Sequence, residues 1–239
     1  MWYLLNLSYK IIIKYISKNK MSQNTSGFYK IFSYPIFYSL TQKIMSGVST
    51  RALLVKNVIN KNAKVLDIGC GTAKIIESLP PLVDYYGYDI SKKYINYAKK
   101  KYKSKTNNFY CKKFNIKEIN KLPKFDFILL FGIMHHLDDE ELYTIFPILK
   151  KTLKKNGTLI TCDPIFKKKQ NIIANFLVKS DVGNNVRYKS GYLKLLKKHF
   201  NKINSKIQNQ AFIPYTWFST QCKKWLIEYH LSNDKVLKS

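Results

Sequence analysis

An aspartate and two glycines follow a short apolar run near residue 65, in the order Asp67-Ile68-Gly69-Cys70-Gly71. A G-x-G turn between a strand and a helix brings backbone N–H groups close to a bound ligand. A carboxylate at the mouth of such a turn would repel a pyrophosphate, so Asp67 favours a ligand with a cationic group, such as the ammonium of an amino acid. The alternative is a plain glycine turn that Asp67 caps.

A second acidic residue, Asp89, closes the next apolar run, eighteen positions after Gly71. A carboxylate at this place can accept hydrogen bonds from both ribose hydroxyls of a nucleoside. The alternative is that Asp89 only caps the helix predicted to begin near Ser91.

Two adjacent histidines, His135 and His136, are candidates for a general base, because the pKa of histidine suits proton transfer near neutrality. Neighbouring side chains diverge, so one ring could face a cleft while the other packs, or both could be structural. Asp163 closes a later apolar run and is a second candidate, with loop capping before Pro164 as its alternative. The four acids of 138–141 are typical of charge at a helix N-terminus.

The chain carries 42 lysines and arginines and a net charge of +28, but only Arg51 and Arg187 are arginines. Drift toward A- and T-rich codons explains most of the lysine, so the charge alone does not indicate a specific nucleic-acid partner. An arginine kept in such a chain favours a planar fork that binds a carboxylate or phosphate, and Arg187 is the candidate for an anionic acceptor. Its alternative is an ion pair with Asp181. Three tyrosines could line the same acceptor wall or pack half-buried: Tyr188, Tyr192 and Tyr215.

The elements that must position these groups are read from alternating apolar runs and helical patterns. Five predicted strands lie at 63–68, 83–90, 109–114, 125–132 and 157–163. Predicted helices lie at 75–79, 91–102, 138–153, about 168–178 and about 190–200, with Lys155-Asn156-Gly157 as a stop between two units. Two late strands near 203–209 and 215–222 fit an antiparallel edge pair. This order predicts an α/β doubly wound sheet, whose ligand lies outside the carboxyl ends of the strands.

Four segments together resemble the class I S-adenosylmethionine-dependent methyltransferases, in the small-molecule branch. They are VLDIGCGTAKI, GYDIS, FDFILLFGIMHHLDDEE and LKKNGTLITCDP. The resemblance is strong over about residues 45–165 and implies a Rossmann-like, seven-stranded, mostly parallel sheet with S-adenosyl-L-methionine as cofactor. Two positions depart from the family pattern, since Ala73 replaces a frequent third glycine and Asn115 stands where an aspartate usually closes strand three.

The resemblance also implies residue roles around the cofactor. Asp67 is expected to face the ammonium and Asp89 to hold the ribose. The remaining contacts are expected from Gly69 and Gly71 on the methionine part, Ile90 on adenine, Asn115 and Ile116 at the adenine edge, and Phe131 beside the sulfonium. A general base is needed only if the acceptor must lose a proton.

Three organisational units are expected: a basic amphipathic extension at 1–20, a helical cap at 21–60 in which Ser49 can cap a helix, and a methyltransferase domain at 61–239. The first unit could lie in a membrane interface, or translation could begin at Met21. Four widely spaced cysteines without a C-x-x-C pair predict free thiols in a reducing, cytoplasmic compartment and no metal site.

The expected function is a methyltransferase that acts on a small molecule, such as a sugar, a lipid precursor or another metabolite. One alternative is an RNA methyltransferase. It is favoured only by charge, because no Asn-Pro-Pro-Tyr or Asp-Pro-Pro-Phe follows the fourth strand and Cys162 lies inside a strand. The non-enzyme alternative is a protein that binds S-adenosylmethionine without turnover.

Overall fold

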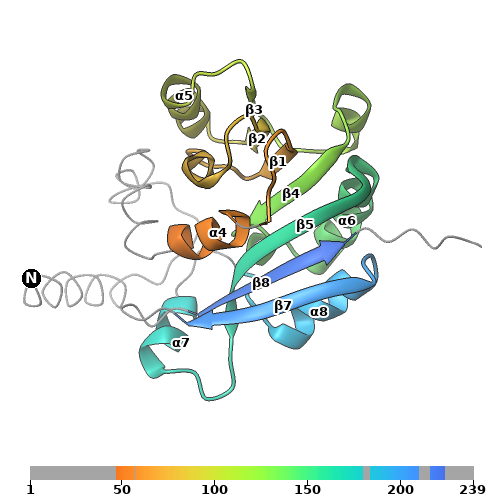
Figure 1. Ribbon diagram of the computed structural model, residues 1–239. Coiled ribbons are helices and arrows are strands. Elements are labelled where there is room, and N and C mark those ends of the chain that lie inside the picture. The colour runs from red at the N-terminus through yellow and green to blue at the C-terminus, as the bar shows by residue number, and fades with distance from the viewer. Residues whose placement is uncertain (1–46, 57, 180–183, 210–215, 224–239) are drawn as a thin grey trace, which may run out of the picture.

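The computed structural model describes residues 47–56, 58–179, 184–209 and 216–223. One mixed sheet with the strand order β3-β2-β1-β4-β5-β8-β7 forms the centre of the molecule (Figure 1). Strands β1 to β5 pair in parallel, β8 is antiparallel to β5, and β7 is antiparallel to β8. The predicted seven strands therefore lie on this path. An eighth strand, the two-residue β6 (Arg187–Tyr188), pairs with the end of β5 and was not predicted.

The elements have the following bounds. The strands are β1 Lys64–Ile68, β2 Asp84–Asp89, β3 Asn107–Cys111, β4 Phe125–Phe131, β5 Leu153–Phe166, β7 Lys202–Asn209 and β8 Thr216–Lys223. The α-helices are α4 Gly47–Lys56, α5 Lys92–Lys101, α6 Asp139–Thr152, α7 Ile172–Lys179 and α8 Lys189–Lys197. The short 3-10 helices are η1 Lys74–Ser78, η2 Ile116–Lys121 and η3 Met134–His136.

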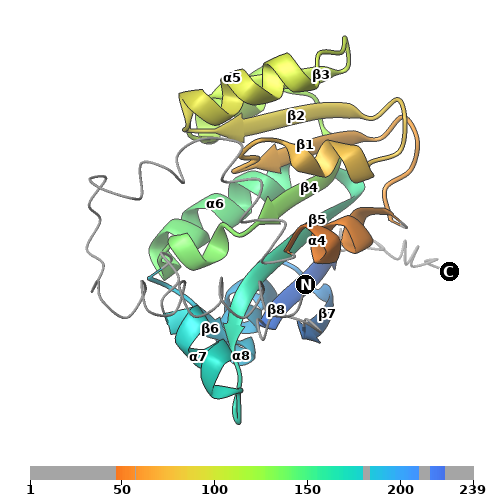
Figure 2. The same cartoon turned by 90° about the vertical axis from the view of Figure 1, so that its left-hand side faces the viewer.

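Helices cover both faces of the sheet, because successive residues of the central strands are apolar on both sides. On β4, Ile128 and Leu130 pack into the core beneath α6 and α8, while Leu129 and Phe131 pack into the core that includes α4, α5 and α7. Figure 2 shows α5 beside β2 and β3 at one end of the sheet, and α8 with β7 and β8 at the other end. This is the doubly wound arrangement that the sequence predicts.

The strand order reverses between β1 and β4, which are neighbours at the centre of the sheet. The crossovers diverge there, so a crevice for a ligand is expected outside the carboxyl ends of these two strands. Asp67 and Phe131 lie at or next to those ends, and Asp163 lies near the carboxyl end of the adjacent β5.

Three local predictions were wrong. The helix predicted at 75–79 is the short η1, which begins after Ala73 in a left-handed conformation (φ 54°). Ser49 does not cap the start of a helix, because it lies inside α4, which already includes Gly47. The predicted stop at 155–157 lies inside β5, whose pairing with β4 shifts register between Phe125 and Phe127.

The other predicted elements agree with the structure within a few residues, including the late edge pair β7–β8. The extension at 1–20, residues 21–46 of the predicted helical cap, Asp181 and Tyr215 lie outside the described residues. Within the described ranges, no helix has both the length and the apolar character needed to cross a membrane.

Candidate active site

The glycine turn after β1 is held closed by the end of β2. Gly69 and Gly71 have positive φ values of 71° and 55°, a conformation that glycine adopts without steric cost. The N–H groups of Gly69 and Cys70 donate to the carbonyl of Tyr88, at 2.7 and 3.0 Å. The Gly71 N–H donates to Asp89 Oδ2 at 2.9 Å. The glycine turn and the loop that follows β2 are therefore joined directly.

Asp89 is shared between this turn and α5. Its Oδ1 accepts from the Ser91 N–H at 2.7 Å, while the Ser91 hydroxyl caps α5. Burial raises the pKa of Asp89, and the backbone N–H groups of Ser91, Gly71 and Ile90 oppose that rise. Each carboxylate oxygen has a second lone pair, so these contacts leave acceptor capacity for a ribose hydroxyl.

Asp67 is a buried carboxylate, with 3% of its surface exposed. The Tyr85 hydroxyl donates to its Oδ2 at 2.6 Å. Burial raises the pKa of Asp67 to about 7, although the Tyr85 hydrogen bond and the charge of Arg51 both lower it. A cation near this carboxylate would therefore stabilise its ionised form.

Arg51 on α4 lies beside several of the predicted site residues, although the sequence analysis did not single it out as a site candidate. Its guanidinium lies 5.9 Å from the ring centroid of Phe131 and 5.5 Å from that of Trp217. A Cβ added to Gly132 would meet Arg51 Nη2 at 2.8 Å and His135 Cε1 at 3.7 Å, so both side chains lie beside Gly132. The scarcity of arginine, which singles out Arg187, applies equally to Arg51 and was the signal that could have found it.

Two isoleucines after neighbouring strands present unusual exposed apolar surface. Ile90 follows β2 and is 78% exposed, and Ile116 begins η2 after β3 and is 59% exposed. Asn115 caps η2, since its Oδ1 accepts from the Lys117 N–H at 2.9 Å and its Nδ2 donates to the Lys113 carbonyl at 3.3 Å. Both ends of the Asn115 amide are thus engaged within its own loop.

His135 and Asp163, two separate candidates for the base, are in direct contact. His135 Nδ1 lies 2.8 Å from Asp163 Oδ1, and the His135 N–H donates to the same oxygen at 3.2 Å. The side chains are 6% and 1% exposed. Among the described residues, no donor reaches the buried Oδ2 of Asp163.

The neighbouring His136 is exposed, and its ring lies 4.1 Å from that of His135 between centroids. One of the two adjacent histidines is therefore buried and the other lies at the surface, although their rings lie against each other and do not diverge as predicted. Phe131 ends β4 within the core and pairs in register with Cys162.

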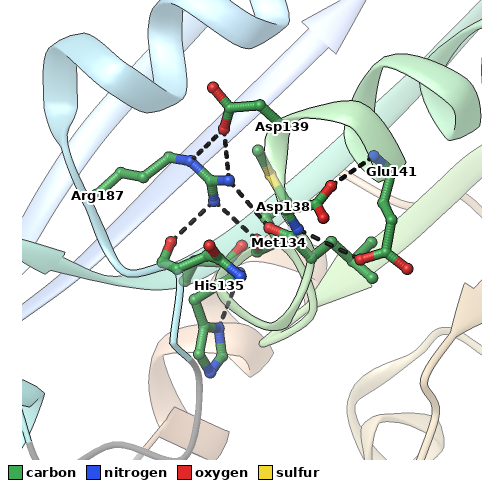
Figure 3. Close-up of polar contacts among 9 residues, drawn as sticks. Met134, His135, Asp138, Asp139, Glu141 and Arg187 are labelled. Atoms are coloured by element: carbon green, nitrogen blue, oxygen red, sulfur yellow. Dashed lines mark hydrogen bonds and ion pairs between the residues drawn. The ribbon is translucent and has the colours of Figure 1, made fainter.

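Arg187 does not present a fork to an acceptor, which corrects the prediction for this residue. Its five N–H groups are all donated within the chain (Figure 3). Nε and Nη2 donate to Asp139 Oδ1 at 3.0 and 2.6 Å, so the ion pair forms with Asp139. The remaining bonds go to three backbone carbonyls: Met134 at 3.0 Å, Asn185 at 2.8 Å and Leu137 at 2.9 Å.

The described tyrosines of the predicted acceptor wall have different surroundings. Tyr188 is exposed and its ring lies near that of Phe166. Tyr192 is buried, and its hydroxyl donates to the Pro164 carbonyl at 2.9 Å. Tyr192 is therefore part of the hydrophobic core, whereas the Tyr188 ring lies at the protein surface.

Cys162 is buried within β5, and burial raises the pKa of its thiol to about 12. A thiol with that pKa is protonated at neutral pH and is a poor nucleophile. Across the described parts of the chain, no three histidine, cysteine or acidic side chains form a group that could hold a metal ion.

Comparison with known proteins supplies the family. Residues 59–219, more than half of the chain, match a family model described as a methyltransferase domain. No curated protein matches the sequence.

Several solved structures share the fold at low sequence identity. Human N-acetylserotonin methyltransferase in complex with SAM is 14% identical with a TM-score of 0.58, over 84% of this chain and 60% of that chain. The N-methyltransferase NodS of Bradyrhizobium japonicum is 15% identical with a TM-score of 0.58, over 74% and 94%. The plantazolicin methyltransferase BamL, in complex with a substrate analogue and SAH, is 16% identical with a TM-score of 0.56, over 81% and 92%.

This chain spans about three fifths of the human enzyme, so that likeness concerns the shared fold. The family match, the strand order and the glycine turn beside Asp67 and Asp89 agree with one another. The chain belongs to the class I S-adenosylmethionine-dependent methyltransferases.

Proposed function

We propose that this chain methylates a small-molecule acceptor whose reacting oxygen or nitrogen must lose a proton. The contact between His135 and Asp163 carries this proposal. Methyl transfer to an atom whose lone pair is already available needs only alignment and exclusion of water. A general base beside the site therefore favours an acceptor atom that must lose a proton.

The cofactor supplies a methyl group on a cationic sulfur. The residues of the glycine turn and the adjacent acids suit its other parts: Asp67 the ammonium, the Gly69 and Gly71 turn the methionine chain, and Asp89 the ribose. The exposed apolar side chains of Ile90 and Ile116 suit the two faces of an adenine ring. Phe131 would border the reacting sulfur from the end of β4.

The tautomer of His135 suits this residue to act as the general base. A carboxylate accepts hydrogen bonds and cannot donate them, so the neutral ring places its proton on Nδ1, toward Asp163. Nε2 then carries the lone pair that can take a proton from the acceptor. Asp163 also orients the ring and stabilises the charge that forms when Nε2 is protonated.

The structural relatives support a small acceptor. The human enzyme is named for N-acetylserotonin, and BamL is a plantazolicin methyltransferase. A sugar, a lipid precursor or another metabolite stays open for this chain. The anion-binding role predicted for Arg187 is not part of the proposal, because its N–H groups are already donated.

An assay with isotopically labelled donor on fractionated extract of the source cell tests the substrate class. Label in a small-molecule or lipid fraction supports the proposal, whereas label in RNA would favour the RNA alternative. Absence of turnover with every fraction would favour a protein that only binds the donor.

The base is tested with two matched variants once an acceptor is known. His135→Gln is expected to lower kcat by about 10²- to 10⁴-fold while donor affinity measured by calorimetry is unchanged. His136→Gln, which changes the exposed neighbour, is the control and should retain most of the turnover. Equal activity of His135→Gln and the native chain would remove the proton-transfer role.

A further inference from the structure

Arg187 binds the loop between β4 and α6 from outside. Four of its five hydrogen bonds join this loop or the first residue of α6 to the chain after α7: one to Met134, one to Leu137 and two to Asp139. The side chain is only 13% exposed, and it also donates to the Asn185 carbonyl of its own segment. Figure 3 shows the guanidinium among these carbonyls, on the far side of the loop from the His135 ring.

The chemistry of these partners requires a guanidinium. Three carbonyl oxygens and one carboxylate oxygen accept from this one side chain, and the five N–H groups of a rigid guanidinium fork can meet them together. A lysine ammonium has three donors around one point and cannot reach all four acceptors. This explains why an arginine is found here in a chain whose basic residues are otherwise almost all lysine.

The same loop carries His135 between the two residues whose carbonyls Arg187 binds. The carbonyl of His135 accepts from the Asn185 N–H at 2.9 Å, two residues before Arg187. On its other side, both the N–H and Nδ1 of His135 contact Asp163 of β5. His135 is therefore held between β5 and the 185–187 segment.

We infer that Arg187 is a positioning residue for His135. It fixes the backbone of η3, so that the imidazole stays against Asp163 with Nε2 directed toward the reacting centre. This inference rests on the proposed function only where it takes His135 as the base. The placement of the His135 ring by Arg187 can be measured without any turnover.

The test follows the ring signals of the four histidines by NMR in the full-length chain, labelled at histidine. The His135 signals are identified by their absence from His135→Gln. Arg187→Ala is expected to shift them, and guanidinium ion at a concentration far below denaturing levels should restore them. Lys189→Ala, which removes a positive charge from an exposed residue two positions away, is the matched control and should leave them unchanged.

With acceptor, Arg187→Ala is expected to lower kcat by up to about 100-fold, as for a misplaced reacting group, with donor affinity retained. Arg187→Lys should show the same signal shift and serves in place of Arg187→Ala if that chain does not fold. A folded Arg187 variant whose His135 signals coincide with those of the native chain would overturn the inference. Shifted signals together with full activity of His135→Gln would instead overturn the base in the proposed function and leave the positioning role standing.

Discussion

Asp67 is the residue whose surroundings oppose its own charge most clearly. It is buried beside the glycine turn, and it accepts a hydrogen bond from the neutral hydroxyl of Tyr85. Burial raises the pKa of Asp67 to about 7 even though Arg51 lies close enough to lower it. A cation that binds nearby would therefore stabilise the ionised form of this carboxylate, and the ammonium of the methyl donor would supply that cation.

Asp67→Asn is expected to raise the melting temperature of the ligand-free chain more at pH 8 than at pH 4. Between the ordinary pKa of 3.8 and about 7, the unfolded chain releases the Asp67 proton while the folded chain keeps it, so the free energy of unfolding falls as pH rises. Asparagine does not titrate and escapes this loss. Thermal unfolding of variant and native chain at both pH values checks it, with Glu140→Gln as an exposed control.

A difference in melting temperature that is the same at pH 4 and pH 8 would contradict the raised pKa of Asp67. The same variant should bind the donor more weakly at pH 8, because it lacks the carboxylate proposed for the ammonium. A group that lowers stability while it strengthens binding is typical of a functional site.

Asp89→Ala is expected to weaken donor binding by roughly 1.5–3 kcal/mol, about ten- to a hundredfold, the range for hydrogen bonds to a charged group. The variant removes the proposed ribose acceptor and also the bond to the Gly71 N–H. Isothermal calorimetry with the demethylated product measures the effect. Glu77→Gln, which breaks an exposed ion pair with Lys101, is the control, and equal affinity of all three chains would remove Asp89 from the site.

At the scale of elements, the sequence was most informative where a pattern is local. Asp67 and Asp89 could be placed at strand ends because apolar runs stop there, and β1 to β5 were found for the same reason. The helix after β1 was not predictable from its apolar spacing. Ala73 takes a left-handed conformation and Pro80 follows six residues after the start of η1, so little room exists for an α-helix.

Contacts between distant segments could not be predicted. His135 and Asp163 are 28 residues apart, and both were candidates for the general base. No sequence periodicity predicts that their side chains are in contact. Arg187 pairs with Asp139, 48 residues away, and with backbone carbonyls that have no signature in the sequence. The scarcity of arginine singled out Arg187 as a side chain with a fork of donors, but it could not predict that the acceptors belong to the chain itself.

Helix α6 begins with a capping box, and Asp138→Ala is expected to lower the free energy of unfolding by about 1 kcal/mol. Asp138 Oδ1 accepts from the Glu141 N–H at 2.8 Å, and the Asp138 N–H donates to Glu141 Oε2 at 3.3 Å. Urea unfolding measures the change. Glu140→Ala removes a charge from the same turn without a cap bond and should cost less, so equal losses would show that charge rather than capping stabilises this helix start.

At the scale of the molecule, the charge of +28 is spread over many exposed lysines. Several of them stand in the last turns of helices, where a cation stabilises the helix dipole: Lys99 to Lys101 on α5, Lys150 and Lys151 on α6, and Lys194 and Lys197 on α8. These helices lie on different faces of the sheet. A charge distributed in this way favours weak attraction to any polyanion over one defined nucleic-acid surface.

RNA binding is therefore expected to be weak, unselective and strongly dependent on salt, because contacts to phosphate release counterions and carry no sequence information. Fluorescence anisotropy with a single-stranded and a structured RNA, at low and at physiological salt, measures affinity and slope. Two double variants remove the same charge from different helices: Lys99→Gln with Lys100→Gln on α5, and Lys194→Gln with Lys197→Gln on α8. If the charge acts generically, both pairs reduce binding to a similar, small extent. A large loss from one pair alone, or nanomolar selective binding at physiological salt, would instead identify a nucleic-acid surface and make RNA the preferred acceptor.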